Sequence, residues 1–247
     1  MLMALSHDKH IICEKPFTLN ANQAKHIFEI ANSKNLFVME ALWTRFLPLT
    51  QEIVKQVSDG LIGTIKEAKM YFSFMAKKEK TSRLFDPKLG GGALLDIGLY
   101  PIVYANLLFG RPNHIEVNSI EMYNKVDINS TLAYHYNKHK VIMKSSFKHA
   151  ERVEIILTGE KGQIKIPNFV GGQFAMIYDN KKNLISKIEM PFECNGFEYQ
   201  IRDAVACISN KKTQSTISSH HHTIEILSQM DDIRSLWHLS YPDEALV

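Results

Sequence analysis

Residues 10–40 carry the pattern that most restricts the fold, because a strand, a helix and a second strand follow one another there. The stretches "HIICE" and "LFVME" are short apolar strand candidates. Four apolar side chains between them share one helical face: Ala24, Ile27, Phe28 and Ala31. A helix of about 12 residues between two buried strands predicts a right-handed parallel crossover, in a sheet with helices on both faces.

The pattern changes after residue 60. Stretches such as "TIKEAKMYFSF", "KVIMKSSF" and "RVEIILTG" are rich in β-branched and aromatic residues and are separated by short loops, which predicts antiparallel strands. Helical spacing returns at about 197–209 and 221–238. We expect an α/β (α+β) chain, in which residues 1–45 are the remnant of a Rossmann-type parallel sheet. Residues 46–247 then form a mainly antiparallel, open-sheet domain with helices on one face.

Composition and charge exclude some partners. The chain has 247 residues, of which 45% are hydrophobic, and its formal net charge is only +3 without a basic stripe, which argues against nucleic acid. The opening "MLMALSHDKH" is too short for a signal-peptide core, and we expect no apolar run near the roughly 18 residues of a membrane span. We therefore expect a cytoplasmic protein with no membrane segment.

Metal chemistry is not expected. The three cysteines lie far apart, without the spacing of a zinc site, and are interpreted as reduced thiols. His220, His221 and His222 are the one dense group of metal-capable side chains. Adjacent residues on a helix point in different directions, so a solvated helix start is favoured over a metal site.

Two segments carry candidate chemistry. Lys15 follows the first strand in "CEKP", and "GGGALLDIGLYPI" places Asp96 and Tyr100 four residues apart, on one helical face. Pro101 would be tolerated if the helix begins near Asp96, with that residue as its N-cap. The structural alternatives are a surface lysine, a helix cap and a packed tyrosine.

Together with "EALWTRFLP", these segments resemble the Gfo/Idh/MocA oxidoreductases, and most closely the branch of dimeric dihydrodiol dehydrogenase and NADP-dependent xylose dehydrogenase. The resemblance implies a Rossmann domain for NADP or NAD and a C-terminal domain with a large open sheet. It implies hydride transfer between the nicotinamide and a hydroxyl of a sugar, polyol or trans-dihydrodiol. It also implies a homodimer formed through the open sheet face.

The resemblance assigns roles to individual residues. Tyr100 matches the acid/base residue and Lys15 its supporting lysine, while Asp96 matches a family carboxylate that orients Tyr100, Lys15 or the substrate. A nearby ammonium favours an ionised phenol, so we expect Lys15 to lower the pKa of Tyr100 from its usual value of about 10. Substrate contacts are assigned to Lys15, Trp43, Asp96 and Tyr100, and cofactor contacts to Glu14, Lys15, Pro16, Trp43 and Arg45.

One element of the family pattern does not occur in these 247 residues. No GxGxxG loop follows a strand in this sequence. We therefore expect that these 247 residues lack the segment that forms roughly the first third of other family members. We expect these residues alone to bind NADP or NAD weakly. Two hypotheses stay open: a shortened oxidoreductase, or a non-catalytic sugar-binding or interaction module derived from one.

Overall fold

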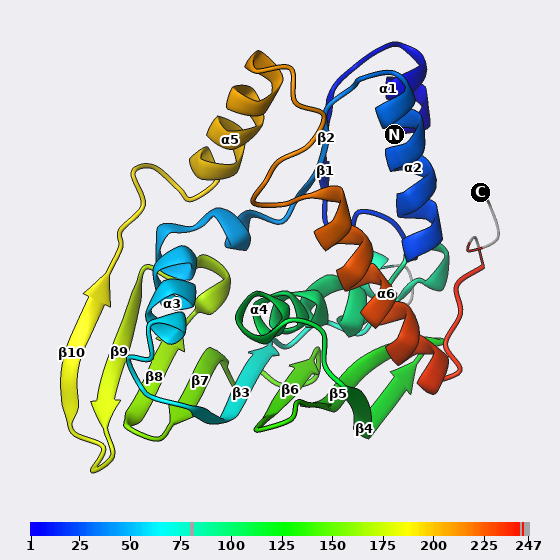
Figure 1. Cartoon of the computed structure of the whole chain (residues 1–247). Helices are drawn as coiled ribbons and strands as arrows, with labels where there is room; N and C mark the ends of the chain where they lie inside the picture. Colours follow the sequence, from blue (N-terminus) through cyan, green and yellow to red (C-terminus); the bar gives the residue numbers. More distant parts are fainter. Residues whose placement is uncertain (80–81, 243, 245–247) are drawn as a thin grey trace.

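The computed structural model describes residues 1–79, 82–242 and 244. Its N-terminal part contains a two-stranded parallel sheet, in which β1 (Ile11–Glu14) pairs with β2 (Val38–Ala41). The helix α2 (Ala21–Ser33) connects the two strands, and α1 (Leu2–Ser6) precedes them. The predicted parallel crossover is therefore confirmed (Figure 1).

Local chemistry explains where α2 begins and how it packs. The Asn20 side chain caps the helix by accepting a hydrogen bond from the Gln23 N–H at 2.9 Å. Ala24 and Phe28 are buried in a cluster that also contains Leu5 of α1 and Leu227 of α6 (His220–Leu236). The last helix of the chain thus covers the first crossover.

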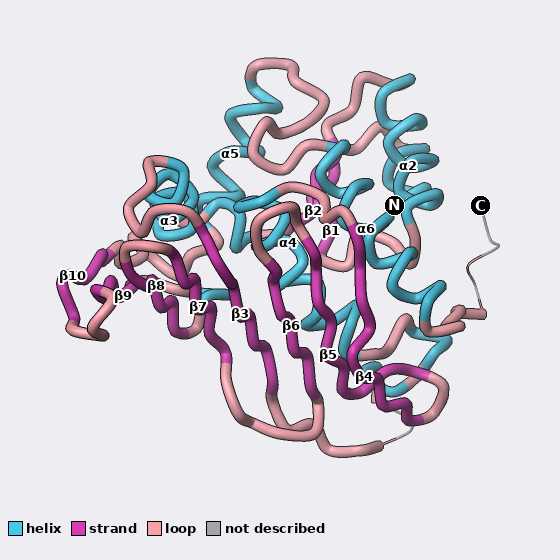
Figure 2. The backbone as a smooth tube through the Cα atoms, turned by 60° about the horizontal axis from the view of Figure 1, so that its bottom comes forward, coloured by secondary structure: helices cyan, strands magenta, loops and turns pink. Residues whose placement is uncertain are grey.

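The larger sheet has eight strands in the order β10-β9-β8-β7-β3-β6-β5-β4. Among the described strands of this sheet, only β3 and β6 pair in parallel, and the other neighbours are antiparallel (Figure 2), which confirms the predicted open sheet. The strands are β3 (Ile65–Ser73), β4 (His114–Tyr123), β5 (Val126–His135), β6 (Lys140–Ser146), β7 (Val153–Gly159), β8 (Gly162–Pro167), β9 (Phe174–Asp179) and β10 (Leu184–Glu189).

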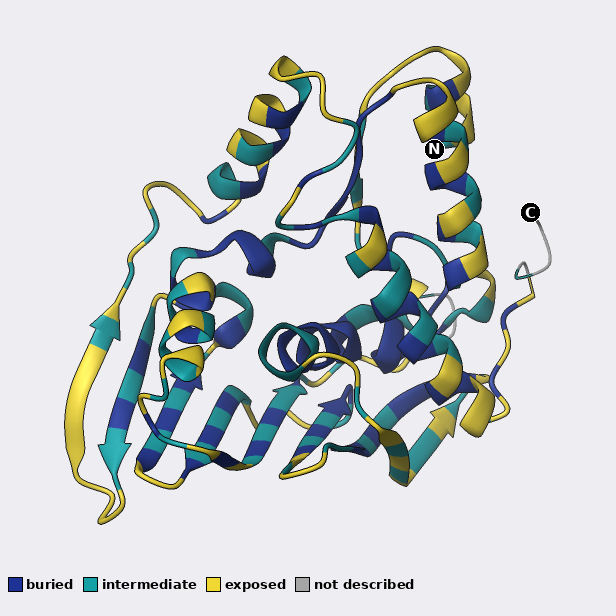
Figure 3. Ribbon diagram, in the orientation of Figure 1, coloured by how far each residue is buried: buried dark blue, intermediate teal, exposed yellow. Residues whose placement is uncertain are grey.

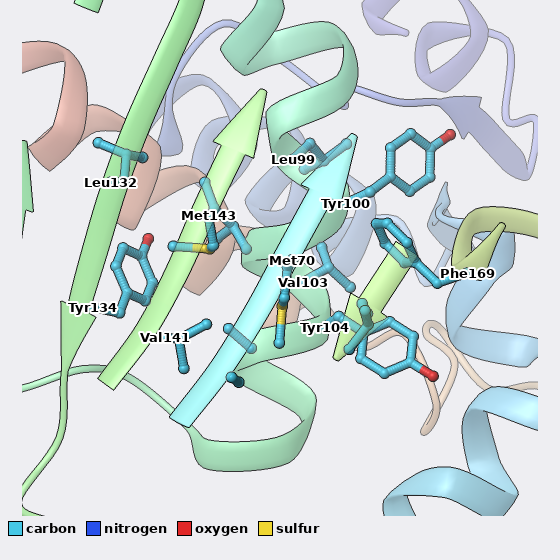
Figure 4. Packing of buried hydrophobic residues seen from close by; sticks show 14 of the residues in the cluster. Met70, Leu99, Tyr100, Val103, Tyr104, Leu132, Tyr134, Val141, Met143 and Phe169 are labelled. Carbon is cyan, nitrogen blue, oxygen red and sulfur yellow. The ribbon is translucent and has the colours of Figure 1, made fainter. Parts of the chain in front are cut away.

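Within the described part of the chain, helices cover one face of this sheet (Figures 1 and 2). They include α3 (Pro48–Ser58) and the central α4 (Leu99–Phe109), while α5 (Glu198–Ser209) stands beyond the end of the sheet. Buried and partly exposed residues alternate along β7 and β8 (Figure 3), as expected for strands with one covered face. In the core, Met70 and Met143 of the sheet lie against Val103 of α4 (Figure 4).

The α4 region corrects two expectations. Pro87–Phe109 is long and apolar enough to cross a membrane by length and composition, with a mean hydropathy of 1.5, contrary to the expected lack of such a run. Because 72% of its most apolar window is buried in the protein, it is explained as the core helix. Asp96 is also not an N-cap, since it lies inside a π-helical turn, Leu94–Gly98, that continues into α4.

The histidine group begins α6 as expected, and His221 is exposed, but His220 is not solvated. His220 is 7% exposed, stacks on Phe28 with ring centroids 3.9 Å apart, and places Nε2 3.0 Å from the Val38 carbonyl oxygen. His222 completes a capping box with Ser219. Among the described residues, no group of His, Cys, Asp or Glu side chains is arranged to hold a metal ion. His220 therefore joins α6 to the first crossover.

Candidate functional site

Lys15, Asp96 and Tyr100 meet at the junction of the two sheets, although 81 positions separate Lys15 from Asp96. Lys15 follows β1 directly, and its Nζ donates hydrogen bonds to the Asp96 carbonyl oxygen at 2.5 Å and to Asp96 Oδ1 at 3.1 Å. The same Nζ lies 5.1 Å from the centroid of the Tyr100 ring. The side chains of Lys15 and Asp96 are 16% and 13% exposed, so this ion pair remains accessible to a small molecule.

A second cation shares the Asp96 carboxylate. Arg83, in the short helix η2 (Arg83–Phe85), donates from Nη2 to Asp96 Oδ1 at 3.1 Å, and its side chain is 57% exposed. Sequence analysis did not identify Arg83, because "TSRLF" matches no motif and its contact with Asp96 depends on the loop between β3 and the π-turn. The site therefore presents two positive side chains around one carboxylate.

Tyr100 holds its proton in this environment. Burial raises its pKa to about 12, the charges of Asp96, Glu14 and Glu40 act in the same direction, and hydrogen bonding with the Trp43 side chain opposes them. Lys15 lies over the ring and is bonded to Asp96. The expected lowering of the pKa of Tyr100 by Lys15 is therefore not seen, and a phenol in this state is a proton donor at neutral pH.

An aromatic wall borders the site. Trp43, in η1 (Trp43–Phe46), stacks on Phe197 with ring centroids 4.7 Å apart, and Phe192 lies 6.2 Å from it. A Cβ at Gly196 would lie only 2.6 Å from Trp43 Cζ3, so glycine is needed for this close approach. Sequence analysis identified Trp43 but missed both phenylalanines, which flank Gly196 in "PFECNGF" and act only through this tertiary contact.

The remaining predicted residues lie around rather than within this cluster. Glu14 is exposed at the end of β1, and Pro16 follows Lys15 with intermediate exposure. Arg45 is only 2% exposed, and its Nε donates to the Ile217 carbonyl oxygen at 3.0 Å. Burial lowers the pKa of Arg45 to about 10, against the opposing charge of Glu40. Arg45 is therefore a buried side chain, and none of its described hydrogen bonds joins it to Lys15, Asp96 or Tyr100.

Glu40 supports the segment that carries Lys15, and sequence analysis did not single it out. It is 2% exposed, its Oε1 accepts from the Phe17 N–H at 3.1 Å, and its Oε2 accepts from Thr223 Oγ1 at 2.9 Å. Because Phe17 is two residues from Lys15, Glu40 ties the turn after β1 to β2 and α6.

The glycines before Asp96 are packed inside the protein. A Cβ at Gly91 would lie 2.8 Å from the carbonyl oxygens of Arg83 and Leu84, and one at Gly92 would collide with Asp127 Oδ1. These residues follow a short helix, η3 (Pro87–Leu89), rather than a strand. Their role here is close packing, which differs from the phosphate cradle of a dinucleotide fold.

Comparisons with known proteins agree with this architecture. Trans-1,2-dihydrobenzene-1,2-diol dehydrogenase of Xenopus tropicalis is 28% identical over 253 residues, which cover 98% of this chain and 75% of the relative. D-xylose 1-dehydrogenase (NADP(+)) of Hypocrea jecorina is 25% identical, with 98% and 70% covered. Aldose-aldose oxidoreductase from Caulobacter crescentus superposes with a TM-score of 0.83 at 20% identity, over 94% of this chain and 71% of that one, which shows a shared fold.

Two family profiles match separate parts of the sequence. Residues 1–42 match the oxidoreductase family with an NAD-binding Rossmann fold, and residues 50–165 match the GFO/IDH/MocA C-terminal domain. The first match covers the segment with the two-stranded parallel sheet, and the second covers residues that include strands β3 to β7 of the larger sheet. The chain therefore belongs to the Gfo/Idh/MocA family of oxidoreductases.

Proposed function

We propose that this protein is an NAD(P)-dependent dehydrogenase that acts on a hydroxyl group of a sugar, polyol or trans-dihydrodiol. The observation that carries the proposal is the meeting of Lys15, Asp96 and a protonated Tyr100 beside the aromatic wall. Relatives named as dehydrogenases of a dihydrodiol, of D-xylose and of scyllo-inositol support this substrate class.

The chain's own residues supply the proton and the charge. In the reducing direction, Tyr100 gives its phenolic proton to a carbonyl oxygen and becomes a phenolate. In the oxidising direction, that phenolate takes the proton of the hydroxyl, so Tyr100 must first lose its own proton to solvent. Lys15 places a positive charge where negative charge develops on that oxygen, and Asp96 holds the ammonium in place. When bound, the nicotinamide would supply the hydride in reduction and accept it in oxidation.

The described residues fit one end of the cofactor. Lys15 and the indole of Trp43 would hold the nicotinamide, with Glu14 and Pro16 beside it. The glycine cluster at 90–92 is filled by backbone and by Asp127, so it offers no pyrophosphate cradle. The proposed cofactor is therefore NADP or NAD, bound at its nicotinamide end by this chain.

The aromatic wall fits the proposed substrates. Phe197 is 41% exposed and stacks on Trp43, so an apolar ring face lies open beside the polar cluster. Sugars and dihydrodiols present an apolar face together with hydroxyl groups at the edge. We propose that the wall binds the face of the substrate ring while Lys15 and Tyr100 bind the reacting oxygen.

We further propose a homodimer formed through the uncovered face of the large sheet. The strand register places Lys69 of β3 between Ile142 of β6 and Ile156 of β7, so apolar and basic side chains alternate across that face. Light scattering should report a dimer at tens of micromolar, and Ile156→Glu should dissociate it; a wild-type monomer would contradict the proposal. A cytoplasmic location stays a prediction.

We also propose a division of the chain into a cofactor-side part, residues 1–45, and a substrate and oligomerisation domain, residues 46–247. The separate family matches over 1–42 and 50–165 support this division.

Turnover on a substrate panel tests the proposed function. The 247-residue chain, and the same chain extended by any in-frame coding sequence upstream of Met1, are assayed with NADP and NAD against pentoses, hexoses, inositols and trans-dihydrodiols. We expect turnover with at least one of these classes, and stronger cofactor binding if the extended chain contains a GxGxxG loop. Sugar binding without any nicotinamide-linked turnover would favour the non-catalytic module instead.

A further inference from the structure

Two buried side chains from distant parts of the sequence form hydrogen bonds with the segment that leads into Asp96. Asp127 of β5 accepts a hydrogen bond at Oδ2 from the Leu94 N–H at 2.8 Å. Tyr241, near the end of the chain, donates its hydroxyl to the Gly91 carbonyl oxygen at 2.6 Å. Asp127 and Tyr241 are 0% and 4% exposed, so both bonds lie inside the protein.

The fit around Gly92 shows how tightly this segment is held. Gly92 has a φ of +118°, and a Cβ there would collide with Asp127 Oδ1 and lie 3.2 Å from Tyr241 Oη. The Gly92 carbonyl oxygen accepts from the Asp96 N–H at 3.3 Å. Because of this hydrogen bond, a displacement of Gly92 would also displace Asp96, which binds Lys15.

Tyr241 is held in place by further bonds, and Asp127 brings a carboxylate to the segment. Tyr241 stays in place because its N–H donates to Glu244 Oε2 at 3.0 Å, while Glu244 pairs with Arg234 of α6. The Asp127 carboxylate lies at the start of the helical segment, where it accepts from the Leu94 N–H. Its Oδ1 has no hydrogen-bond partner among the described residues, which makes the group costly to bury.

We propose that Asp127 and Tyr241 are positioning residues for the candidate active site, and that they hold Gly91–Leu94 so that Asp96 presents its carbonyl and carboxylate oxygens to Lys15. The effect of this pair on catalysis rests on the proposed function, whereas its effect on the Lys15–Asp96 contact does not. The pair acts through the backbone and does not touch the reacting atoms.

The test compares matched variants of the 247-residue chain. Tyr241→Phe removes the hydroxyl that binds the Gly91 carbonyl, Asp127→Ala removes the acceptor for the Leu94 N–H, and Asp127→Asn keeps an acceptor. The control is Tyr136→Phe, because the Tyr136 hydroxyl donates to the Gly110 carbonyl oxygen at 2.9 Å, at the opposite end of α4. The readout is the rate at which an amine-acetylating reagent modifies Lys15, followed by mass spectrometry, with thermal melts to confirm folding.

We expect Tyr241→Phe and Asp127→Ala to speed Lys15 modification by about threefold to tenfold, the change in a local opening equilibrium when one buried hydrogen bond is lost. Asp127→Asn and Tyr136→Phe should stay within about twofold of the wild type. If Asp127→Ala does not fold, the comparison of Tyr241→Phe with Tyr136→Phe decides alone.

Wild-type modification rates in the folded Tyr241→Phe and Asp127→Ala variants would overturn the proposal, even if the variants melt earlier. Where turnover is measurable, Tyr241→Phe should lower kcat more than it changes KM. If no substrate is turned over but Lys15 labelling follows the prediction, the proposed function fails and the positioning role stands.

Discussion

Glu40 allows a quantitative test of how the turn carrying Lys15 is held. Glu40→Leu keeps a similar side-chain size but removes the acceptor for the Phe17 N–H at 3.1 Å and for the Thr223 hydroxyl at 2.9 Å. A buried donor left without a partner costs about 1–3 kcal/mol. The backbone donor at Phe17 has no alternative acceptor described, while the Thr223 hydroxyl is able to rotate. We therefore expect a loss of about 2–4 kcal/mol in the free energy of unfolding.

Glu40→Gln is the matched control, because it keeps an acceptor for Phe17 and removes only the charge. Burial raises the pKa of Glu40 above its ordinary value, so between the unfolded and folded pKa values the folded state binds more protons than the unfolded state. The contribution of this group to stability is full below the unfolded pKa of about 4.3 and is lost as the pH rises through the folded pKa. The wild type should therefore lose stability relative to Glu40→Gln as the pH rises.

Urea denaturation of the three proteins at about pH 5 and about pH 8 measures both effects. We expect Glu40→Leu to have the lowest free energy of unfolding at both pH values. At the higher pH, the free energy of unfolding of the wild type should fall relative to that of Glu40→Gln. If Glu40→Leu matches Glu40→Gln at both values, Glu40 does not hold this turn, and the reasoning from its two hydrogen bonds is refuted.

Three further outcomes are expected. Burial raises the pKa of Asp127 to about 7, while the hydrogen bond from the Leu94 N–H and the charge of Arg234 oppose the rise; wild type should lose up to roughly 2–4 kcal/mol relative to Asp127→Asn between about pH 4 and pH 8 in urea melts, and parallel curves would contradict this. Gly196→Ala places a Cβ 2.6 Å from Trp43 Cζ3 at a φ of +93°, so it should shift Trp43 fluorescence and raise KM; an unchanged spectrum would exclude displacement of the indole. Lys15→Met should lower kcat by roughly 10²–10³, the usual effect of losing one group that stabilises a developing negative charge; wild-type turnover in this variant would remove Lys15 from the mechanism.

The sequence predicts the local elements well, because their signals are local. Two short apolar runs on either side of a helical apolar face indicate the β1–α2–β2 crossover. The antiparallel sheet follows in the same way from β-branched strands and short loops. The strand order is not local, since β3 lies between β6 and β7 and pairs with both.

The site is predicted only in part, for the same physical reason. The motifs identify Lys15, Asp96 and Tyr100, but the π-turn that contains Asp96 depends on contacts with Asp127 and the Arg83 loop. The pKa of Tyr100 depends on burial, which no motif specifies. His220 was misjudged because its environment comes from Phe28, 192 positions earlier, and a histidine triplet gives no sign of that stacking.

The comparison of Tyr100→Phe with Tyr104→Phe tests the central claim most directly, that Tyr100 transfers the proton in a dehydrogenase site. Both changes remove one hydroxyl and keep the ring, on the same helix and one turn apart, but Tyr104 is fully buried in the core beside Phe169. On the best substrate of the panel, with folding verified by thermal melts, Tyr100→Phe should lower kcat by roughly 10²–10⁴ while Tyr104→Phe keeps near wild-type turnover. Equal turnover of the two variants, under conditions where chemistry limits the rate, would contradict the assignment and leave Tyr100 a packing residue.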